Sequence, residues 1–367
     1  MHIRHIATIG FLLLMTFMSL SNNSYAYEVT DKLLVNGILA GSYQYQNVDN
    51  DDDLGRGAVP FQLELTYSPS PQDIFAAKFG FAAGNGLNDV TNFNLSPWAA
   101  DLEDDVKNIN GSNRDYLLTT WYMHTFVFND DNSLGVTGGI IDATDYLDEN
   151  AYSNDEYTQF MNGALVNGPN AFLPSYDIGG AFQWTINSFL VTGVLMNISE
   201  NDDGNSFNYY GLQLGYTLKT SMGDGNYRIL LGATSKDFFD QTDFTEENRK
   251  CLLLSFDQQI GKNYGAWLRI GTQDDKAAVD YKNIYSGGFY ISGSLWGRAN
   301  DNAGIGYAYL NDGNIDIENS YVLETYVRFG LNDFFAVTLD VQYMNDKYYA
   351  AEKINGFIYG IRAASEF

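Results

Sequence analysis

The segment Phe335-Ala-Val-Thr-Leu-Asp-Val-Gln-Tyr343 alternates between large apolar residues and small or polar ones. The segment Phe61-Gln-Leu-Glu-Leu-Thr-Tyr67 repeats this pattern near the other end of the chain. Alternation with a period of two is typical of a β-strand with one apolar face and one polar face. In a soluble sandwich the apolar faces meet in a core, whereas in a membrane barrel they face lipid and the polar faces line water. The two segments therefore point to one of these two all-β architectures.

The connections between such segments favour the membrane barrel. We expect strands at residues 33–45, 59–68, 72–84, 114–128, 132–141, 176–186, 188–199, 207–219, 225–236, 249–261, 263–273, 287–297, 301–311, 319–330, 333–345 and 354–367. Short turns follow the even strands, and long loops follow many of the odd ones, at residues 46–58, 85–113, 142–175, 237–248 and 274–286. Short turns at one rim and long loops at the other are typical of outer-membrane barrels. The sequence therefore predicts an all-β fold, a closed transmembrane antiparallel β-barrel of about 16 strands with long extracellular loops.

The N-terminus predicts export from the cytoplasm. A short basic lead with Arg4 precedes an apolar stretch at 9–18, and Ser24-Tyr-Ala26 places small residues at a cleavage site. This layout is typical of a secretory signal peptide, and the apolar stretch is too short for a stable membrane helix. We expect a signal peptide at 1–26 and a barrel domain at 27–367, located in the bacterial outer membrane. A retained membrane anchor is the alternative.

The charge balance and the cysteine count exclude several classes of partner and cofactor. The chain has 20 basic and 46 acidic side chains, a net charge of −26, whereas nucleic-acid binding requires clustered Lys and Arg. Cys251 is the single cysteine, which excludes an intrachain disulfide and a cysteine metal site. We therefore expect no nucleic acid, no metal and no cofactor.

Aromatic residues mark the expected edges of the membrane. We expect a girdle of aromatic side chains at strand ends on the apolar face: Trp121, Trp184, Tyr216, Phe329, Phe335 and Tyr343. The chain ends at Phe367, on the apolar face of the last strand. This ending is similar to the signal that the barrel-assembly machinery recognises, which makes that machinery an expected partner.

The longest loop, 142–175, is the candidate for function. It has 34 residues, and its first part holds six acids and no Lys or Arg. Such a loop is uncommon unless functional, and its apolar residues, among them Leu165, need something to pack against. We expect it to fold into the barrel and narrow the pore; the alternative is an exposed acidic loop that divalent cations bridge to lipopolysaccharide. The candidate constriction residues are Asp142, Asp145, Asp148, Glu149, Asn150, Asn154, Asp155, Glu156, Gln159 and Phe160.

The polar strand face supplies candidate lumen residues: Glu64, Lys78, Arg228, Arg269, Glu324, Arg328, Asp340, Gln342 and Arg362. Arginines opposite an acidic loop would create a transverse field and offer paired donors. Carboxylates and amides can bind sugar hydroxyls, and the rings of Trp267 and Tyr326 can cover the apolar face of a sugar. For any single residue, a solvated lumen charge is the alternative interpretation.

Three stretches resemble the OprB-type carbohydrate-selective porins. They are Asp145-Tyr-Leu-Asp-Glu-Asn-Ala-Tyr-Ser-Asn-Asp-Glu156 with its flanks, Gly297-Arg-Ala-Asn-Asp-Asn-Ala-Gly304, and Glu324-Thr-Tyr326 together with 339–343. Leu339 stands where proline is expected from the family. The resemblance implies a sixteen-stranded channel that passes mono- and small oligosaccharides. By the same likeness, Asp142, Asp148, Asn150, Asn154, Glu156 and Gln159 belong to the constriction loop, and Arg298 and Asp301 to a lumen-side structural turn.

Two other functions remain as alternatives. The acidic loop could select cations in a general diffusion porin. A barrel hydrolase would need a base, and His124 is the candidate left after removal of a signal peptide. No serine lies two residues from His124 to pair with it along one strand face, so the sequence favours a channel with no enzymatic activity.

Overall fold

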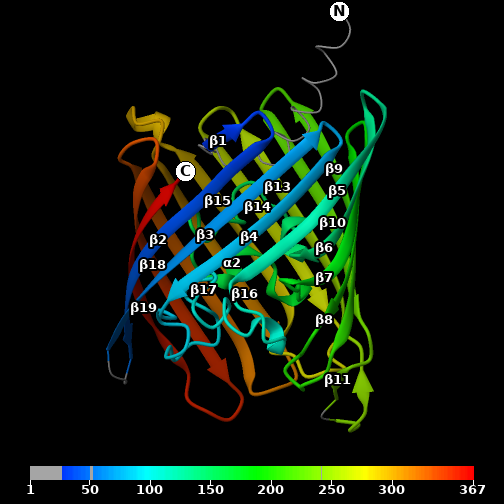
Figure 1. Cartoon of the computed structure of the whole chain (residues 1–367). Coiled ribbons are helices and arrows are strands. Elements are labelled where there is room, and N and C mark those ends of the chain that lie inside the picture. Colours follow the sequence, from blue (N-terminus) through cyan, green and yellow to red (C-terminus); the bar gives the residue numbers. More distant parts are fainter. Residues whose placement is uncertain (1–26, 50–52, 241) are drawn as a thin grey trace, which may run out of the picture.

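The computed structural model describes residues 27–49, 53–240 and 242–367. In this part of the chain, sixteen long antiparallel strands form a closed barrel (Figure 1). They are β2 (Leu33–Val48), β3 (Leu54–Ser70), β4 (Asp73–Ala83), β5 (Leu117–Asn129), β6 (Asn132–Ile141), β7 (Asp177–Ile186), β8 (Phe189–Ile198), β9 (Phe207–Thr220), β10 (Gly223–Thr234), β13 (Lys250–Ile260), β14 (Tyr264–Gln273), β15 (Tyr281–Ser292), β16 (Asn302–Asp312), β17 (Ile317–Gly330), β18 (Phe335–Tyr348) and β19 (Ile354–Glu366). The predicted fold class is confirmed, whereas the predicted signal peptide at 1–26 lies outside the described residues.

The barrel closes where the last strand pairs with the first. The ladder between β19 and β2 runs from Gly356 opposite Val48 to Glu366 opposite Ile38. Beyond it, Phe367 and Gly37 exchange two backbone hydrogen bonds of 2.8 and 3.0 Å. The short strand β1 (Tyr27–Thr30) pairs with the start of β2. Closure therefore leaves the sixteen barrel strands without an unpaired edge.

The alternating pattern gives the barrel its two faces. In β18, Leu339 points outward and is 50% exposed, whereas its neighbour Asp340 points inward and is 2% exposed. Trp184 and Tyr216 also lie on the outward face, as expected for an aromatic girdle. The strand segments that decided the sequence prediction are therefore oriented as predicted.

Strand β5 is oriented differently from its prediction. Trp121 was expected at the lipid interface, but it points into the barrel, and it is Tyr122 and His124 that point outward. This part of β5 carries large residues on both faces, so the sequence offered no clean alternation to fix the orientation. The prediction for Trp121 was wrong for that reason.

Strand β15 begins six residues before its predicted start and ends at Ser292. Ser292 caps the short helix η4 (Gly293–Trp296), because its side chain accepts a hydrogen bond from the backbone N–H of Ser294. Gly297 then ends the helix with a φ of 79°. The loops expected to be long at 46–58 and 274–286 are shorter than predicted, because β2, β3 and β15 extend into them.

The remaining elements are short and lie in the connections. They are η1 (Ile109–Gly111), η2 (Ala143–Asp145), α2 (Gly163–Val166), η3 (Pro169–Ala171) and the hairpin of β11 (Phe238–Phe239) and β12 (Glu246–Glu247). No helix in the described part of the chain is long and apolar enough to cross a membrane. Helix α2 appears inside the barrel, and the C-terminus lies at the same end as β1 and the short turns (Figure 1). We take this short-turn end as the periplasmic one.

The contact between Gly37 and Phe367 yields a stability prediction. A Cβ atom at Gly37 would overlap the Phe367 ring, whereas one at Gly41 on the same strand meets only Val59, at 3.7 Å. We expect Gly37→Ala to weaken closure by about 1–3 kcal/mol, since overpacking displaces the ring. Heat-dependent mobility of the folded barrel on gels measures this change. Gly41→Ala is the matched control, and equal stability of the two variants would contradict the prediction.

Candidate functional site

The third long loop is fastened at its base. Asp142 Oδ1 accepts hydrogen bonds from the Thr144 N–H at 2.8 Å and from the Ser175 hydroxyl at 3.1 Å. The Ala143 N–H also donates to the Pro174 carbonyl at 2.9 Å. These bonds join the two ends of the loop. The residues between them lie inside the barrel, where Arg269, Glu324 and Arg362 of the wall bind them. The inward fold predicted for this loop is therefore observed, and the exposed-loop alternative is excluded.

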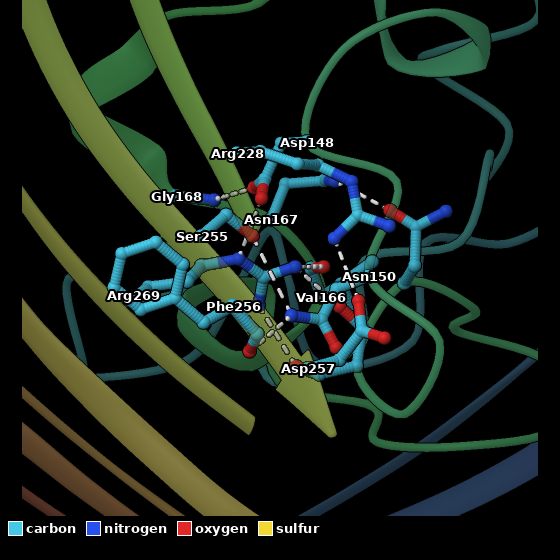
Figure 2. Close-up of polar contacts among 12 residues, drawn as sticks. Asp148, Asn150, Val166, Asn167, Gly168, Arg228, Ser255, Phe256, Asp257 and Arg269 are labelled. Atoms are coloured by element: carbon cyan, nitrogen blue, oxygen red, sulfur yellow. Dashed lines mark hydrogen bonds and ion pairs between the residues drawn. The ribbon is translucent and has the colours of Figure 1, made fainter. Parts of the chain in front are cut away.

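A buried ion pair holds the middle of the loop against the barrel wall (Figure 2). Arg269 on β14 donates from Nε to Asp148 Oδ1 at 2.9 Å, and neither side chain is exposed. The four other Arg269 N–H groups bond to the Ser153 hydroxyl and to the carbonyls of Ser153, Leu165 and Val166. Asp148 Oδ2 accepts from the Gly168 N–H at 2.9 Å. All five guanidinium donors therefore bind the loop, which is the pairing that a buried arginine requires.

Two further lumen candidates also bind the loop backbone. Glu324 accepts hydrogen bonds from the N–H groups of Met161 and Asn162. Arg362 donates to the carbonyl of Glu156 at 2.6 Å and to that of Gln159 at 2.9 Å.

Gln342 and Asp340 complete this part of the wall. Gln342 accepts from the Asn162 side-chain amide at 3.0 Å and donates to Asp340 at 3.1 Å. Gln342 and Glu324 are fully buried, as is Arg362. These residues point inward as the sequence predicts, but they position the loop and do not face open water.

The predicted aromatic platform is covered by the loop. Phe160 packs edge-to-face against Trp267 and Tyr326, with ring centroids 5.8 and 5.1 Å apart. All three side chains are buried. The rings of Trp267 and Tyr326 therefore contact Phe160 and present no free face to a solute.

The remaining arginine candidates are also paired. Arg228 donates to Asp257 at 2.6 Å next to Asn150, which donates to the Phe256 carbonyl at 3.1 Å (Figure 2). Arg328 pairs with Glu366 at 2.8 Å.

Arg298 and Asp301 lie together in the turn after β15, where Asp301 also accepts from the Gly330 N–H at 3.0 Å. Their place is a structural turn at the short-turn rim. The arginines therefore do not form an open row opposite the acidic loop.

A second loop, 84–116, also enters the barrel, and this position was not predicted from the sequence. The Pro97 carbonyl accepts from Gln44 at 3.0 Å and from Gln342 at 2.9 Å, and Trp98 donates to the Glu156 carbonyl at 2.9 Å. The Trp98 side chain is 1% exposed. The two loops therefore form one interior body, which we call the plug, made of residues 84–116 and 142–176.

A cavity of about 480 Å³ lies beside the plug, toward the short-turn end. It is lined by eight acidic side chains: Glu64, Asp101, Asp142, Asp145, Glu149, Asp155, Glu156 and Glu366. Lys78 is the single basic side chain among the described residues that line it, and its Nζ lies 3.6 Å from Asp145 Oδ1. Amides of Gln62, Asn150, Asn154 and Gln159 add to the polar lining. This cavity brings together much of the predicted constriction loop.

A neighbouring cavity of about 290 Å³ shares part of this wall. Glu64, Lys78, Asp145 and Glu149 line both cavities, and Trp121 adds an aromatic surface to the smaller one. Sequence reasoning missed Trp121 here because the orientation of β5 was misread.

Comparison with known proteins places this architecture in a family. Residues 99–367 match the family model of the carbohydrate-selective porin, OprB family. The chain belongs to this family. An uncharacterized protein of Aquifex aeolicus is 32% identical over 269 residues, which cover 72% of this chain and 75% of that protein. Porin AaxA of Chlamydia pneumoniae is 27% identical over 235 residues, 59% of this chain and 52% of that protein. The high-pH structure of Pseudomonas putida OprB superposes with a TM-score of 0.73 at 15% identity, covering 92% of this chain and 94% of that one.

This OprB-family porin is therefore a bacterial outer-membrane channel, and its family and fold are not those of enzymes. The geometry around His124 agrees. Its Nδ1 lies 2.8 Å from Asp73 Oδ1, while the Ser70 hydroxyl donates to Asp73 and not to the imidazole. Activation of a serine requires hydrogen bonds from the serine hydroxyl to the imidazole and from the imidazole to a carboxylate. The bond from serine to imidazole is absent here.

Burial alters the charge of the porin's plug near neutral pH. Burial and the nearby charge of Asp145 raise the pKa of the Asp142 carboxyl to about 7. Burial raises the pKa of Glu149 to about 7, although Arg228 acts in the opposite direction. Burial likewise raises the pKa of Asp101 to about 6. These groups lose negative charge as the pH falls through 7 to 6.

The ion pair of Arg269 and Asp148 yields a test of the plug. Arg269→Met leaves a buried carboxylate unpaired, at a cost of about 3–5 kcal/mol. We expect the loop to loosen and the single-channel conductance in planar bilayers to rise. Lys347→Met, which breaks an exposed pair with Glu318, is the control and should leave conductance unchanged. Unchanged conductance in Arg269→Met would show that the pair does not hold the loop.

The raised pKa values predict pH-dependent ion selectivity. Protonation of Asp142 and Glu149 removes negative charge, so the preference for cations over anions should decrease by roughly twofold from pH 8 to pH 5. Reversal potentials in a salt gradient measure this ion preference. Glu149→Gln should lower the preference for cations at pH 8 and make it change less with pH. Asp53→Asn, at an exposed carboxyl with a lowered pKa, should do neither. A selectivity that stays constant with pH in the native porin would refute this assignment.

Proposed function

We propose that this porin carries small neutral carbohydrates by passive diffusion. The observation that supports the proposal is the pair of adjoining cavities beside the plug, where charged and amide side chains face the ring of Trp121. A sugar presents hydroxyl groups at its edge and C–H groups on its faces. A site for it therefore combines hydrogen-bonding groups with an apolar ring, as this one does.

The chemistry of each wall fits this solute. Glu64 and Lys78 lie opposite each other on β3 and β4 and supply an acceptor and a donor to a shared space. Asp145 and Glu149 add acceptors from the plug. Opposed donors and acceptors match hydroxyl groups, which can both donate and accept. Family membership points to the same class of solute.

A general cation-preferring pore is the second candidate. The eight acidic side chains around Lys78 favour it, because clustered negative charge concentrates cations. The two candidates differ in whether a neutral sugar competes with ions for the same space.

We further propose the cellular context that the sequence predicts. A signal peptide at 1–26 would direct export, and Phe367 would be recognised by the barrel-assembly machinery. Because the third loop lies inside, cation-bridged contact with lipopolysaccharide would use other extracellular segments, such as 235–249. The outward apolar face would contact lipid.

Sugar block of the ion current tests the proposed solute. Added glucose or a maltodextrin should reduce the current through the porin in planar bilayers at millimolar concentrations. Trp121→Ala should raise the half-blocking concentration by roughly threefold to tenfold, because an aromatic surface inside the cavity is lost. Trp184→Ala removes an outward-facing tryptophan and is the matched control. Sugars without effect on the current, together with strong cation selectivity, would favour the second candidate.

A further inference from the structure

A third cavity lies at the short-turn end, on the other side of the plug. Its volume is about 340 Å³, within the range of about 300–1,000 Å³ that is usual for ligand pockets. It is lined by the plug residues Tyr152 and Gln159, by Tyr290, Asn302 and Arg328 of the barrel, and by Glu366. None of the residues predicted from the sequence as a sugar platform lines it.

Two tyrosines form an aromatic surface at this cavity. The rings of Tyr152 and Tyr290 stack with centroids 5.3 Å apart and an interplanar angle of 27°. Gly265 makes room for this arrangement, since a Cβ atom there would overlap the Tyr152 ring. Both tyrosines are only half-buried. In contrast to Trp267 and Tyr326, which Phe160 covers, this aromatic pair stays accessible to a solute.

The cavity wall also holds unused hydrogen-bonding capacity. Asn302 and Arg328 are directly opposite each other on β16 and β17. Asn302 Oδ1 and Arg328 Nε are buried and have no hydrogen-bond partner in the described protein, an arrangement that costs stability. The Arg328 side chain as a whole is 18% exposed, so its guanidinium can donate to a hydroxyl group in the cavity.

The charge balance here differs from that of the first cavity. The lining contains Lys262 and Arg328 as bases and Asp301, Asp333 and Glu366 as acids, whereas the first cavity has eight acids and one base. Such a nearly balanced lining favours an uncharged ligand over an ion.

The first and third cavities adjoin. Ala151, Thr158, Gln159 and Glu366 line both of them. A solute longer than one ring can therefore contact both walls at once, passing the end of the plug.

We propose that the cavity beside Tyr152 and Tyr290 is a second carbohydrate subsite at the periplasmic mouth, which binds a further ring of an oligosaccharide leaving the first cavity. The proposal rests on the proposed function. The stacked tyrosines supply a surface for the sugar face, and the Arg328 guanidinium donates to its hydroxyls. Longer sugars should consequently bind more tightly than glucose.

The test compares current block by glucose and by maltotriose in the intact porin in planar bilayers. For the native porin, the half-blocking concentration of maltotriose should lie below that of glucose. Tyr290→Ala should raise the value for maltotriose by roughly threefold to tenfold and change the value for glucose less. Tyr290→Phe keeps the ring and should behave as native. Tyr285→Ala, on the outward face of the same strand, is the matched control.

Assembly of each variant is checked by heat-dependent gel mobility, and Tyr290→Leu replaces Tyr290→Ala if the latter does not assemble. If neither sugar blocks the native porin, the proposed function fails and the subsite with it. If maltotriose blocks the native porin and the Tyr290 variants lacking the ring equally well, the subsite is refuted while the proposed function stands. A selective loss of maltotriose block on removal of the ring supports the subsite.

Discussion

The structure depends on one constraint: in lipid, every backbone N–H and C=O group must find its partner within the protein. Pairing of β19 with β2 meets this constraint for the sixteen barrel strands, and Phe367 extends the pairing to Gly37. Closure turns the polar faces of the strands inward, and together these faces line an interior of limited volume. A barrel of about this size encloses an aqueous channel unless something else fills it. Here loops occupy much of that space.

The inward polar residues hold these loops. Arg269 gives all five donors to the plug, and Glu324 and Arg362 bind its backbone N–H and carbonyl groups. A buried charge costs free energy unless it is paired. A shift of the loop along the wall would break these pairs, and each pair therefore holds the loop at one position on its strand. The more accessible charges, among them Lys78 of the wall and Asp145 of the plug, line the first cavity. The wall residues that fasten the plug, Arg269, Glu324 and Arg362, therefore do not line the three cavities.

Periodicity was sufficient to predict the strands and the barrel, because lipid and water impose opposite demands on adjacent residues. It failed at Trp121, where both faces of β5 carry large side chains. It also placed Trp267 and Tyr326 correctly inside, but it could not reveal that Phe160 covers them, since this contact joins residues more than 100 positions apart. The loop at 84–116 has no repeating pattern, and its interior position depends on tertiary contacts such as that of Trp98 with Glu156.

Leu147, Phe160 and Leu165 of the plug are buried in one apolar cluster with residues of the barrel wall. The plug's anchors come from the barrel wall, and the hairpin of β11 and β12 contributes none of the anchors described above. Mutations in such outer hairpins can therefore accumulate, for instance under pressure from phage or antibodies, without altering the solutes that pass. The outer hairpins of this porin and the residues inside its barrel can therefore change independently during evolution.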